Sequence, residues 1–363
     1  EGSKRMSVGL IMAGGFGKRL WPESRIDHPK QLLSFGTGES FLQATYRRAC
    51  GLFGVEETYL VLREELKEKV LSHLSSVPPE NIIVEPEGRD TAPCIGFASV
   101  WLGAKKGNVP TVVLPSDHLI RDEDKFARVI RAAAGVAQKD YLVTIGIKPT
   151  RAETGYGYLE LGKEMDQWGG VSVFEVERFT EKPSHKKAKE FFEQGKFLWN
   201  GGIFAWRSSV ILREMKEHLP ELHSGLMRIQ KAMGTSEEEK VIRSVYPSLP
   251  KISIDYGIME KAKGVAAIPG DFFWDDIGNW QALERVFTKN GHGNIIRGLV
   301  EEEESSNCIF INRQDKILGA IGVSDLIVIN TENGTLVVRK EQAGKVRDLV
   351  DRLLADREKG KYV

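Results

Sequence analysis

A glycine-rich loop with two adjacent cations follows the first apolar run of the chain. Leu10 to Arg19 reads LIMAGGFGKR, so the Lys18–Arg19 pair comes shortly after a predicted buried strand. Backbone amides approach a phosphate closely only where side chains are small, and nearby cations add electrostatic attraction. The loop therefore predicts a polyphosphate-binding cradle. A tight turn with solvated cations is the alternative for this loop taken alone.

Two common phosphate-binding motifs do not fit this loop. The dinucleotide-binding pattern G-x-G-x-x-G requires glycine where either Leu20 or Phe16 stands, depending on its starting point. The P-loop pattern requires glycine at Met12 and a hydroxyl residue at Arg19. The residues exclude both motifs and leave a phosphate cradle of another kind.

Charged residues at two later positions could complete such a site. A turn-rich segment from Pro22 to Gln31 presents another cation, Lys30. Asp117 follows an apolar run in LPSDH, which places it at the carboxyl end of a predicted strand, where open α/β folds hold their ligands. Its carboxylate suits a hard divalent cation, although a helix cap or turn is the commoner use of such a residue.

The composition excludes several classes of protein. The chain has 51 Lys and Arg and 51 Asp and Glu, so no overall basic field is present to hold nucleic acid or an anionic membrane. Its three cysteines form no C-x-x-C pair, which argues against a zinc site or a disulfide framework. The apolar stretch near the end, Ile317 to Ile329, is too short to span a bilayer. We expect a packed cytoplasmic protein with no nucleic-acid or membrane partner.

The first half of the chain alternates short β-rich runs with amphipathic stretches of helical length. This alternation is typical of an α/β domain in which crossover helices cover a parallel sheet. The predicted strands span residues 7–12, 58–62, 81–84, 111–114 and 141–146. The predicted helices span residues 41–51, 65–74, 92–106, 123–138, 184–194 and 208–218, and residues 155–178 suggest a hairpin.

The last quarter of the chain has a different character. A glycine-rich polar stretch at 288–294 suggests a boundary between a domain at 6–287 and a second domain at 288–363. Short β-rich runs at 308–312, 317–322, 326–330 and 335–339 precede a charged helix at 342–356, a pattern that resembles a short β-solenoid capped by a helix. The acidic run 301–304 is interpreted as a solvated turn.

Taken together, the motifs resemble those of a known enzyme family. The order AGGFGKRLWPESR…PKQ resembles the nucleotide-binding signature of sugar nucleotidyltransferases, and its Leu-Trp-Pro variant resembles the mannose 1-phosphate guanylyltransferase family. The resemblance continues through EPEGRDTAP, LPSDH, TGYGYLE, EKP, WNGGIF, SIDYGIME, FFWDDIGNW, SNCIFI and VSDLIVI. It implies a Rossmann-like, mostly parallel, glycosyltransferase A-like catalytic domain followed by a small domain resembling a left-handed β-helix.

The resemblance also implies a role for particular residues. Arg19, Lys30 and Lys182 would be catalytic, and Asp117 and Asp276 would hold Mg²⁺, with Asp275 in solvent or behind these ligands. The implied nucleotide-binding residues are Ala13, Gly14, Gly15, Gly17, Lys18, Arg19, Lys30, Glu85, Arg89, Asp90, Thr91, Ser116 and Asp117. The implied sugar phosphate-binding residues are Gly157, Glu181, Lys182, Asn200 and Asp255. His118 is expected to be structural.

Three positions depart from the family pattern. Gly201 and Gly257 stand where many relatives have serine and alanine. Asp90 stands where asparagine is common, and a carboxylate there is suited to accept hydrogen bonds from guanine N1–H and its exocyclic amine. This gives a hypothesis for the choice of base.

The reaction implied by the resemblance is transfer of GMP from GTP to mannose 1-phosphate, giving GDP-mannose and pyrophosphate. One alternative is a nucleotidyltransferase of the same fold that uses another hexose 1-phosphate and nucleotide. Another is a regulatory subunit that keeps the fold without catalysis, although the presence of all five charged site residues argues against it. By analogy with the family, we expect a homodimer.

Overall fold

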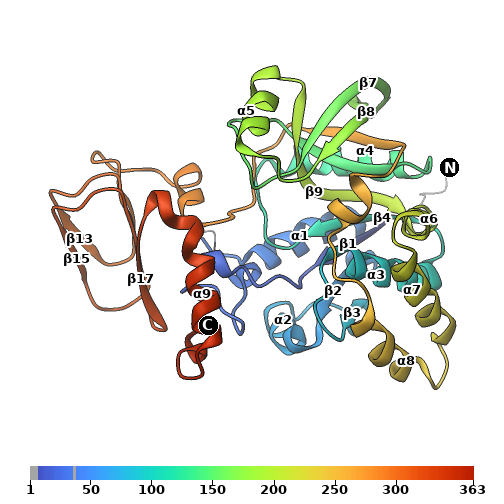
Figure 1. Cartoon of the computed structure of the whole chain (residues 1–363), viewed down its shortest axis with the longest axis horizontal. Coiled ribbons are helices and arrows are strands. Elements are labelled where there is room, and N and C mark those ends of the chain that lie inside the picture. The colour runs from blue at the N-terminus through green and yellow to red at the C-terminus, as the bar shows by residue number, and fades with distance from the viewer. Residues whose placement is uncertain (1–6, 36–37) are drawn as a thin grey trace. The chain divides into compact units, whose positions relative to one another are not determined.

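The computed structural model of the chain describes residues 7–35 and 38–363 (Figure 1). The predicted domain start at Met6 lies outside the described residues. Contacts between residues divide the chain into two compact units that interleave along the sequence. Unit 1 comprises residues up to Gly14, residues 44–116 and residues 120–274, and unit 2 comprises residues 15–43, 117–119 and 275–363. This division differs from the single boundary expected near residue 288.

Unit 1 is built on a nine-stranded sheet with the strand order β3-β2-β1-β4-β9-β6-β10-β8-β7. Strands β1, β2, β3 and β4 pair in parallel, as do β6 and β10, whereas β9 pairs antiparallel with both β4 and β6. The strand bounds are β1 Val8–Met12, β2 Thr58–Arg63, β3 Ile82–Glu85, β4 Pro110–Pro115, β6 Leu142–Ile147, β7 Tyr158–Trp168, β8 Val171–Thr180, β9 Phe197–Arg207 and β10 Val265–Gly270. Two-residue strands β5 (Leu119–Ile120) and β11 (Trp274–Asp275) complete the strands outside the C-terminal region.

The five strands predicted in the first half of the chain are confirmed to within one residue at each end. Strands β1, β2, β4 and β6 are buried along almost their whole length, as continuous apolar runs in a covered sheet require, whereas β3 is buried only at alternate residues. Parallel neighbours end at the same edge of a sheet. The residues that follow β1, β3 and β4 therefore share one edge, and the loop after β1 begins there.

The helices of unit 1 include the predicted crossover helices and two that the sequence pattern did not indicate. The predicted helices are α1 Phe41–Phe53, α2 Lys67–His73, α3 Thr91–Lys106, α4 Glu123–Ala137, α5 His185–Gln194 and α6 Ser208–His218. The additional helices are α7 Pro220–Ala232 and α8 Glu238–Val245. Helices α3, α6 and α7 contact one another, and α8 contacts α7 (Figure 1). Their apolar faces and the sheet bury a continuous core that includes the fully buried Trp206 and Tyr246.

Unit 2 contains the predicted β-helix-like domain. A four-stranded sheet has the order β12-β14-β16-β17, and a separate sheet pairs β13 with β15. Strands β12, β14 and β16 are parallel and in register, so that isoleucines stack from one coil to the next at Ile295, Ile309 and Ile327. The bounds are β12 Ile295–Arg297, β13 Val300–Glu303, β14 Ile309–Asn312, β15 Leu318–Ile321, β16 Leu326–Thr331, β17 Gly334–Arg339 and α9 Val346–Ala355.

The acidic run is a strand, so the interpretation of residues 301–304 as a turn was wrong. Most of the run lies in β13, which pairs in parallel with β15. Side chains along β13 alternate between half-buried and exposed. A strand at the surface tolerates carboxylates because alternate side chains reach water.

The core of unit 2 includes residues from the segment that follows the glycine-rich loop. Leu20 and Trp21 are buried together with Trp280 and with isoleucines of β14 and β16. The Trp280 indole N–H donates to the Trp21 carbonyl at 2.9 Å, and the Trp21 indole N–H donates to the Tyr362 carbonyl at 2.9 Å. These contacts explain why residues 15–43 belong to the same unit as the C-terminal strands.

Candidate functional site

The glycine-rich loop leaves the carboxyl end of β1 next to the ends of its neighbours. The Ala13 amide donates to the Val61 carbonyl of β2 at 2.9 Å, which extends the strand pairing to the start of the loop. A β-carbon on Gly14 would lie 3.2 Å from Glu85 Oε1, whereas one on Gly15 would have open space around it. The backbone at Gly15 is therefore accessible to a ligand.

Gly17 is the glycine of this loop that the fold requires most strictly. Its φ of 77° lies in the left-handed region, and a β-carbon there would collide with the β-carbon of Lys30. The Lys30 amide donates to the Phe16 carbonyl at 3.2 Å, so the two segments lie against each other. The missing side chain of Gly17 makes room for the stem of Lys30.

The three cations of the predicted triphosphate site have different surroundings. Lys18 forms an ion pair of 2.6 Å with Asp351 on α9. Arg19 is exposed and has no ion pair with any residue in the described part of the chain. Lys30 is 6% exposed, and its ammonium donates to Asp117 Oδ2 at 2.7 Å and to the Asp276 carbonyl. Arg19 is thus the cation of this group most open to a ligand.

The structure brings Asp117 and Asp276 together around one ammonium. Burial opposes the charged form of Asp117, but the positive charge of Lys30, followed by that of His118, outweighs burial and lowers the pKa of Asp117. Burial is the largest influence on His118 and lowers its pKa, against the nearby negative charge of Asp117. Among the described residues, no three His, Cys, Asp or Glu side chains form a metal cluster. A divalent cation here would take two carboxylates from the protein and its other oxygen ligands from the substrate and water.

These residues fit a hard divalent cation. Carboxylate oxygens are the ligands that Mg²⁺ prefers, and Mg²⁺ usually keeps several positions for water and phosphate. The Lys30 ammonium, which contacts an Asp117 carboxylate oxygen and the Asp276 backbone carbonyl, shows that oxygens of both residues can face one cation. Asp275, by contrast, is 4% exposed and is held by Arg285, with Arg285 Nη2 2.9 Å from its Oδ1. Of the two alternatives expected for Asp275, a position in solvent was wrong, and its carboxylate is paired with Arg285 within the protein.

Several of the residues expected to bind the nucleotide lie at the ends of β3 and β4 and at the start of α3. Glu85 is 3% exposed and accepts a hydrogen bond from the Tyr246 hydroxyl through Oε2, and burial raises the pKa of Glu85. Asp90 precedes α3 with a φ of 70°, and its Oδ1 accepts from the Thr91 amide at 2.7 Å. Tyr246 was not a predicted site residue, because nothing near it in the sequence indicates that it reaches Glu85.

Arg89, Thr91 and Ser116 have partners in the surrounding backbone. Arg89 Nε donates to the Leu249 carbonyl at 2.9 Å, and Thr91 Oγ1 accepts from the Ile254 amide at 2.8 Å. The Ser116 amide donates to the Met12 carbonyl at 3.2 Å, which holds the end of β4 beside the end of β1. These contacts fix the positions of three residues that are expected to bind the nucleotide.

The predicted sugar phosphate residues form a second cluster, within unit 1. Lys182 Nζ lies 2.6 Å from Glu181 Oε1, and Asn200 Nδ2 donates to Asp255 Oδ1 at 2.8 Å. The Asn200 amide donates to the Gly157 carbonyl at 2.8 Å. All five predicted residues are therefore linked, because the charge of Glu181 also acts on Asp255.

Charge in this cluster is unevenly balanced. Burial, followed by the negative charge of Glu181, raises the pKa of Asp255 to about 7. Burial disfavours the charged form of Lys182, but Glu181 and Asp255 outweigh it and raise the pKa of Lys182. The Glu181 side chain is 6% exposed, and its Oε2 has no hydrogen-bond partner among the described residues. A β-carbon on Gly157 would lie 2.5 Å from this oxygen, so a larger residue there would displace the Glu181 carboxylate.

The two glycines that depart from the family pattern lie in confined places. A β-carbon on Gly201 would lie 3.0 Å from the Ile145 carbonyl oxygen, and one on Gly257 would lie 2.8 Å from Leu219 Cδ1. A larger residue at either position would require its surroundings to move. The structure therefore accounts for glycine at both positions.

An aromatic cluster beside Asn200 was not predicted from the sequence. The ring of Tyr156 contacts those of Trp199 and Trp274 edge-on, with centroid distances of 5.1 and 5.2 Å. The Arg151 guanidinium lies 4.9 Å from the centre of the Trp199 ring. Because Tyr156 belongs to the TGYG motif, the aromatic residue at its centre was the available signal.

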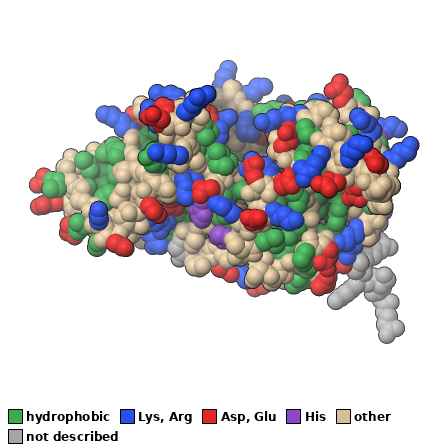
Figure 2. All heavy atoms as spheres, turned by 90° about the horizontal axis from the view of Figure 1, so that it is seen from below, with side chains coloured by type: hydrophobic (Ala, Val, Ile, Leu, Met, Phe, Trp, Pro, Cys, Tyr) green, Lys and Arg blue, Asp and Glu red, His purple; other side chains and the backbone are tan. Residues whose placement is uncertain are grey.

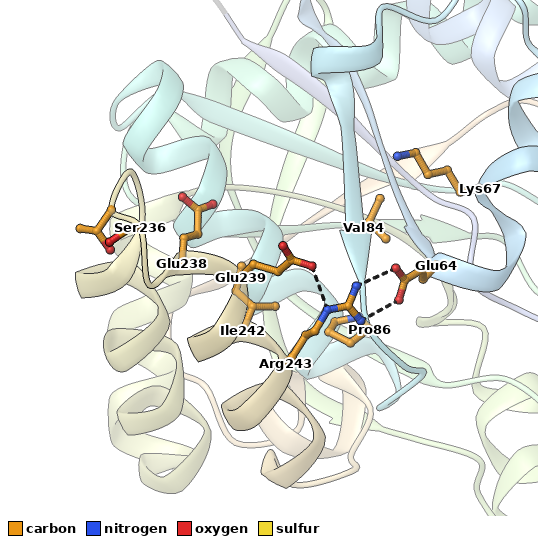
Figure 3. A pocket seen from close by; sticks show the side chains of 10 residues that line it. Glu64, Lys67, Val84, Pro86, Ser236, Glu238, Glu239, Ile242 and Arg243 are labelled. Atoms are coloured by element: carbon orange, nitrogen blue, oxygen red, sulfur yellow. Dashed lines mark hydrogen bonds and ion pairs between the residues drawn. The ribbon is translucent and has the colours of Figure 1, made fainter.

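The pocket drawn in Figure 3 lies elsewhere in unit 1. Its volume is about 410 Å³, and no predicted site residue lines it. Arg243 in this pocket is held by Glu64 at 2.9 Å and by Glu239 at 3.0 Å, as the dashed lines show (Figure 3). This arginine is thus neutralised by two carboxylates, which gives no reason to place a phosphate there.

The surface carries charges of both signs. On the face drawn in Figure 2, acidic and basic side chains are interspersed. Among the residues that the structure describes, no helix is both long and apolar enough to cross a membrane. Any attraction for a polyphosphate therefore has to come from a local group of cations such as that around the glycine-rich loop.

Known proteins are similar to this chain over most of its length. The family model described as Nucleotidyl transferase matches residues 8–292, and the MannoseP isomerase/GMP-like beta-helix domain model matches residues 303–353. A mannose-1-phosphate guanylyltransferase of Escherichia coli is 35% identical over 350 residues, covering 95% of this chain and 74% of the relative. The relative RfbM of Salmonella typhimurium, with the same enzyme name, is 36% identical over 95% of this chain and 72% of its own length.

A solved structure is similar over nearly the whole chain. It is that of a Thermus thermophilus protein named mannose-1-phosphate geranyltransferase, with 37% identity and a TM-score of 0.84. The match covers 96% of this chain and 99% of that one. Fold, loop and charged residues together define a nucleotidyltransferase. Within that class, the chain belongs to the mannose-1-phosphate guanylyltransferase family.

Proposed function

We propose that the protein transfers GMP from GTP to mannose 1-phosphate, producing GDP-mannose and pyrophosphate. The family membership supports the substrates, because the relatives bear the name of this activity. The site supports the reaction type, because it combines an accessible glycine-rich loop with separate groups of cations. The observation that carries the proposal is the grouping of Lys30, Asp117 and Asp276 beside that loop.

In the proposed reaction, an oxygen of the sugar phosphate attacks the α-phosphorus of GTP, and the bond to the leaving pyrophosphate breaks. No catalytic base is needed, because the second pKa of a phosphate monoester is about 6 and the nucleophile is already largely dianionic at neutral pH. The barrier comes from bringing polyanions together, so positioning and electrostatic stabilisation should dominate.

The chain's own cations would divide this task. Arg19 and Lys30 would hold the β and γ phosphates and stabilise the charge of the leaving pyrophosphate. Lys182, whose ammonium is half-exposed beside Glu181, would hold the phosphate of the sugar. Glu181, Asn200 and Asp255 would hydrogen-bond the sugar hydroxyls, which carboxylates and amides are suited to do.

We propose Mg²⁺ as the cofactor, held by Asp117 and Asp276. When bound, it would neutralise charge on the α-phosphate oxygens. We also propose a homodimer located in the cytoplasm. Size-exclusion chromatography with light scattering would measure the molecular mass and test the dimer.

Pyrophosphate release tests the proposal. The assay should cover the four nucleoside triphosphates against mannose 1-phosphate, glucose 1-phosphate and other hexose 1-phosphates, with Mg²⁺ or with a chelator. We expect the highest rate with GTP and mannose 1-phosphate in the presence of Mg²⁺. A clear preference for another pair would identify the related nucleotidyltransferase, and release from no pair would favour a subunit without catalysis.

A further inference from the structure

We propose that the Lys30 ammonium is the resting counter-ion of the metal site. In the free protein it occupies the place of the divalent cation beside Asp117 and Asp276, and it leaves this place when a triphosphate offers it other oxygens. The protein without nucleotide therefore binds a divalent metal weakly. This inference rests on the proposed function for the position of the metal ligands, and it adds an order in which the ligands bind.

The contacts of Lys30 place its charge where a metal would sit. The ammonium lies 2.7 Å from Asp117 Oδ2 and also donates to the Asp276 backbone carbonyl. Both are hard oxygen ligands of the kind that Mg²⁺ prefers. An ammonium and a divalent cation cannot occupy one position against the same Asp117 oxygen.

The surroundings of the side chain restrict where the ammonium can go. The Lys30 side chain is only 8% exposed, and its stem fills the space left by the missing side chain of Gly17. The residue begins a short 3-10 turn, Lys30–Leu32, and its ammonium also lies 5.9 Å from the centre of the Phe41 ring. The enclosed stem keeps the ammonium close to Asp117 until another strong acceptor arrives.

The other basic side chains near Asp117 do not balance its negative charge as closely as Lys30 does. His118 Nε2 lies 3.8 Å from Asp117 Oδ1, whereas the Lys30 ammonium lies 2.7 Å from Asp117 Oδ2. Arg285 is committed to Asp275, with its Nη2 2.9 Å from Asp275 Oδ1. Lys30 is therefore the principal positive charge that balances Asp117 in the free protein.

The arrival of a triphosphate changes this balance. A nucleoside triphosphate brings several negative oxygens, which can replace Asp117 as acceptors for the ammonium. The Lys30 ammonium and a divalent cation would repel each other at a separation of about 4 Å. Movement of Lys30 towards the phosphates therefore favours metal binding at the carboxylates. Metal and nucleotide would then bind with positive cooperativity, through the release of one lysine.

Metal affinity of the protein without nucleotide tests the inference directly. The probe is Mn²⁺, which can be followed by electron paramagnetic resonance or calorimetry. For Lys30→Met we expect at least a tenfold gain in Mn²⁺ affinity over the unmodified protein, because the competing ammonium is gone. Unchanged or lower affinity in this variant would overturn the inference.

A matched control separates this effect from general loss of positive charge. Lys340 is also a buried lysine of unit 2, 7% exposed, and its ammonium donates to Glu284 at 2.8 Å and to Asn307 at 2.7 Å. Lys340→Met should leave Mn²⁺ affinity within about twofold of the unmodified protein. An equal gain in both lysine variants would contradict a specific role for Lys30.

A second variant, Lys30→Gln, tests the inference if Lys30→Met does not fold. Lys30→Gln keeps a polar end that can donate to Asp117, yet it lacks the charge, so it should also bind Mn²⁺ more tightly. Both variants should lose turnover under the proposed function, whereas the inference requires a gain in metal affinity. A protein that proves inactive in the pyrophosphate assay would refute the proposed function and still leave the Mn²⁺ comparison decisive for Lys30.

Discussion

Lys182 and Asp276 carry opposite charges, and each has a distinct proposed partner, the sugar phosphate or the metal. Burial disfavours the charged form of Lys182, but Glu181 and Asp255 outweigh it and raise the pKa of Lys182. Lys182 therefore stays charged under ordinary conditions. Asp276 lies next to the Lys30 ammonium through its carbonyl and receives the Gly278 amide on Oδ1 at 3.1 Å. Substitution of either residue therefore removes a charged group and leaves the apolar core unchanged.

Loss of either charge should slow the reaction strongly. We expect Lys182→Ala and Asp276→Asn each to lower kcat about 10²- to 10³-fold, as for removal of single electrostatic groups in other active sites. Steady-state kinetics with GTP and mannose 1-phosphate would measure the change, with circular dichroism as a check on folding. Near-normal rates in both folded variants would contradict these roles.

Asp255 provides a prediction for the dependence of stability on pH. Its folded-state pKa of about 7 lies above its ordinary value of 3.8, because burial and then Glu181 oppose its charge. The folded state therefore favours the protonated form, and this contribution to stability is lost as pH rises from about 4 through 7. Relative to Asp255→Asn, the unmodified protein should lose up to ~1.4 kcal/mol of unfolding free energy per pH unit in this range.

Denaturant unfolding of both proteins between pH 5 and pH 8 would measure this difference. The variant should gain relative stability as pH rises. A difference that does not change with pH would show that Asp255 titrates at its ordinary value.

Asp90 carries the hypothesis about the choice of base. Its Oδ1 already accepts from the Thr91 amide, so its other oxygen is the one that a guanine would meet. We expect Asp90→Ala to lower the ratio of kcat/KM for GTP to that for ATP by about tenfold or more, as loss of a paired hydrogen-bonding group in base recognition does. Asp90→Asn can still cap α3 through its one oxygen but turns a donor towards the base, so it should also lower the ratio and separates base reading from loss of the cap. An unchanged ratio in Asp90→Ala would rule out base reading by this residue.

At the scale of elements, sequence patterns predicted the strands and helices for which local composition and tertiary packing favour the same structure. The strand β9 was missed because its sequence FLWNGGIFAWR contains Asn-Gly-Gly, which is typical of a turn. In the structure the strand continues through a register shift opposite Thr144 to Gly146, with Gly202 at a φ of 67°. Tertiary pairing on both sides of β9 overrides the local preference.

Helix α7 was missed for a related reason. Pro220 begins the helix, and Gly225 interrupts its apolar pattern in the interior. A β-carbon on Gly225 would collide with Leu249, so the glycine permits close packing against a distant segment. Such a requirement cannot be read from the helix sequence alone.

Gly17 gives a prediction for the loop as an element. Gly17→Ala should destabilise the protein by about 1–2 kcal/mol through its left-handed backbone alone, and by more through the collision with Lys30. It should also raise KM for GTP, because Lys30 would be displaced. Gly38→Ala is a matched control, since Gly38 has a φ of 80° with open space around it. Equal effects of both substitutions on stability and KM would contradict the role of the close contact.

At the scale of the whole molecule, the proposed functional residues are distributed over the two units. Arg19, Lys30, Asp117 and Asp276 belong to unit 2, together with the C-terminal strands. The sugar phosphate residues, including Lys182, belong to unit 1. The sequence resemblance identified these residues by motif, but the approach of Lys30 to Asp117, 87 positions away, and to the Asp276 carbonyl, 246 positions away, depends on the fold.

This distribution predicts different effects of core substitutions in the two units. Ile329→Ala in the core of unit 2 should cost about 2–5 kcal/mol and raise KM for GTP, because Leu20 and Trp21 pack in that same core beside Arg19. Its effect on KM for mannose 1-phosphate should be smaller. Ile229→Ala, at an equally buried position of unit 1, is the control. Equal increases in KM for GTP in both variants would contradict the role of the unit 2 core in holding the loop.

The most direct test of the proposed activity is identification of the product by mass spectrometry after incubation with GTP and mannose 1-phosphate. We predict that GDP-mannose forms in equal amount to pyrophosphate when Mg²⁺ is present, and that Lys182→Ala reduces both together. Absence of GDP-mannose from a folded, metal-supplied protein, while another sugar nucleotide forms or no reaction occurs, would contradict this account.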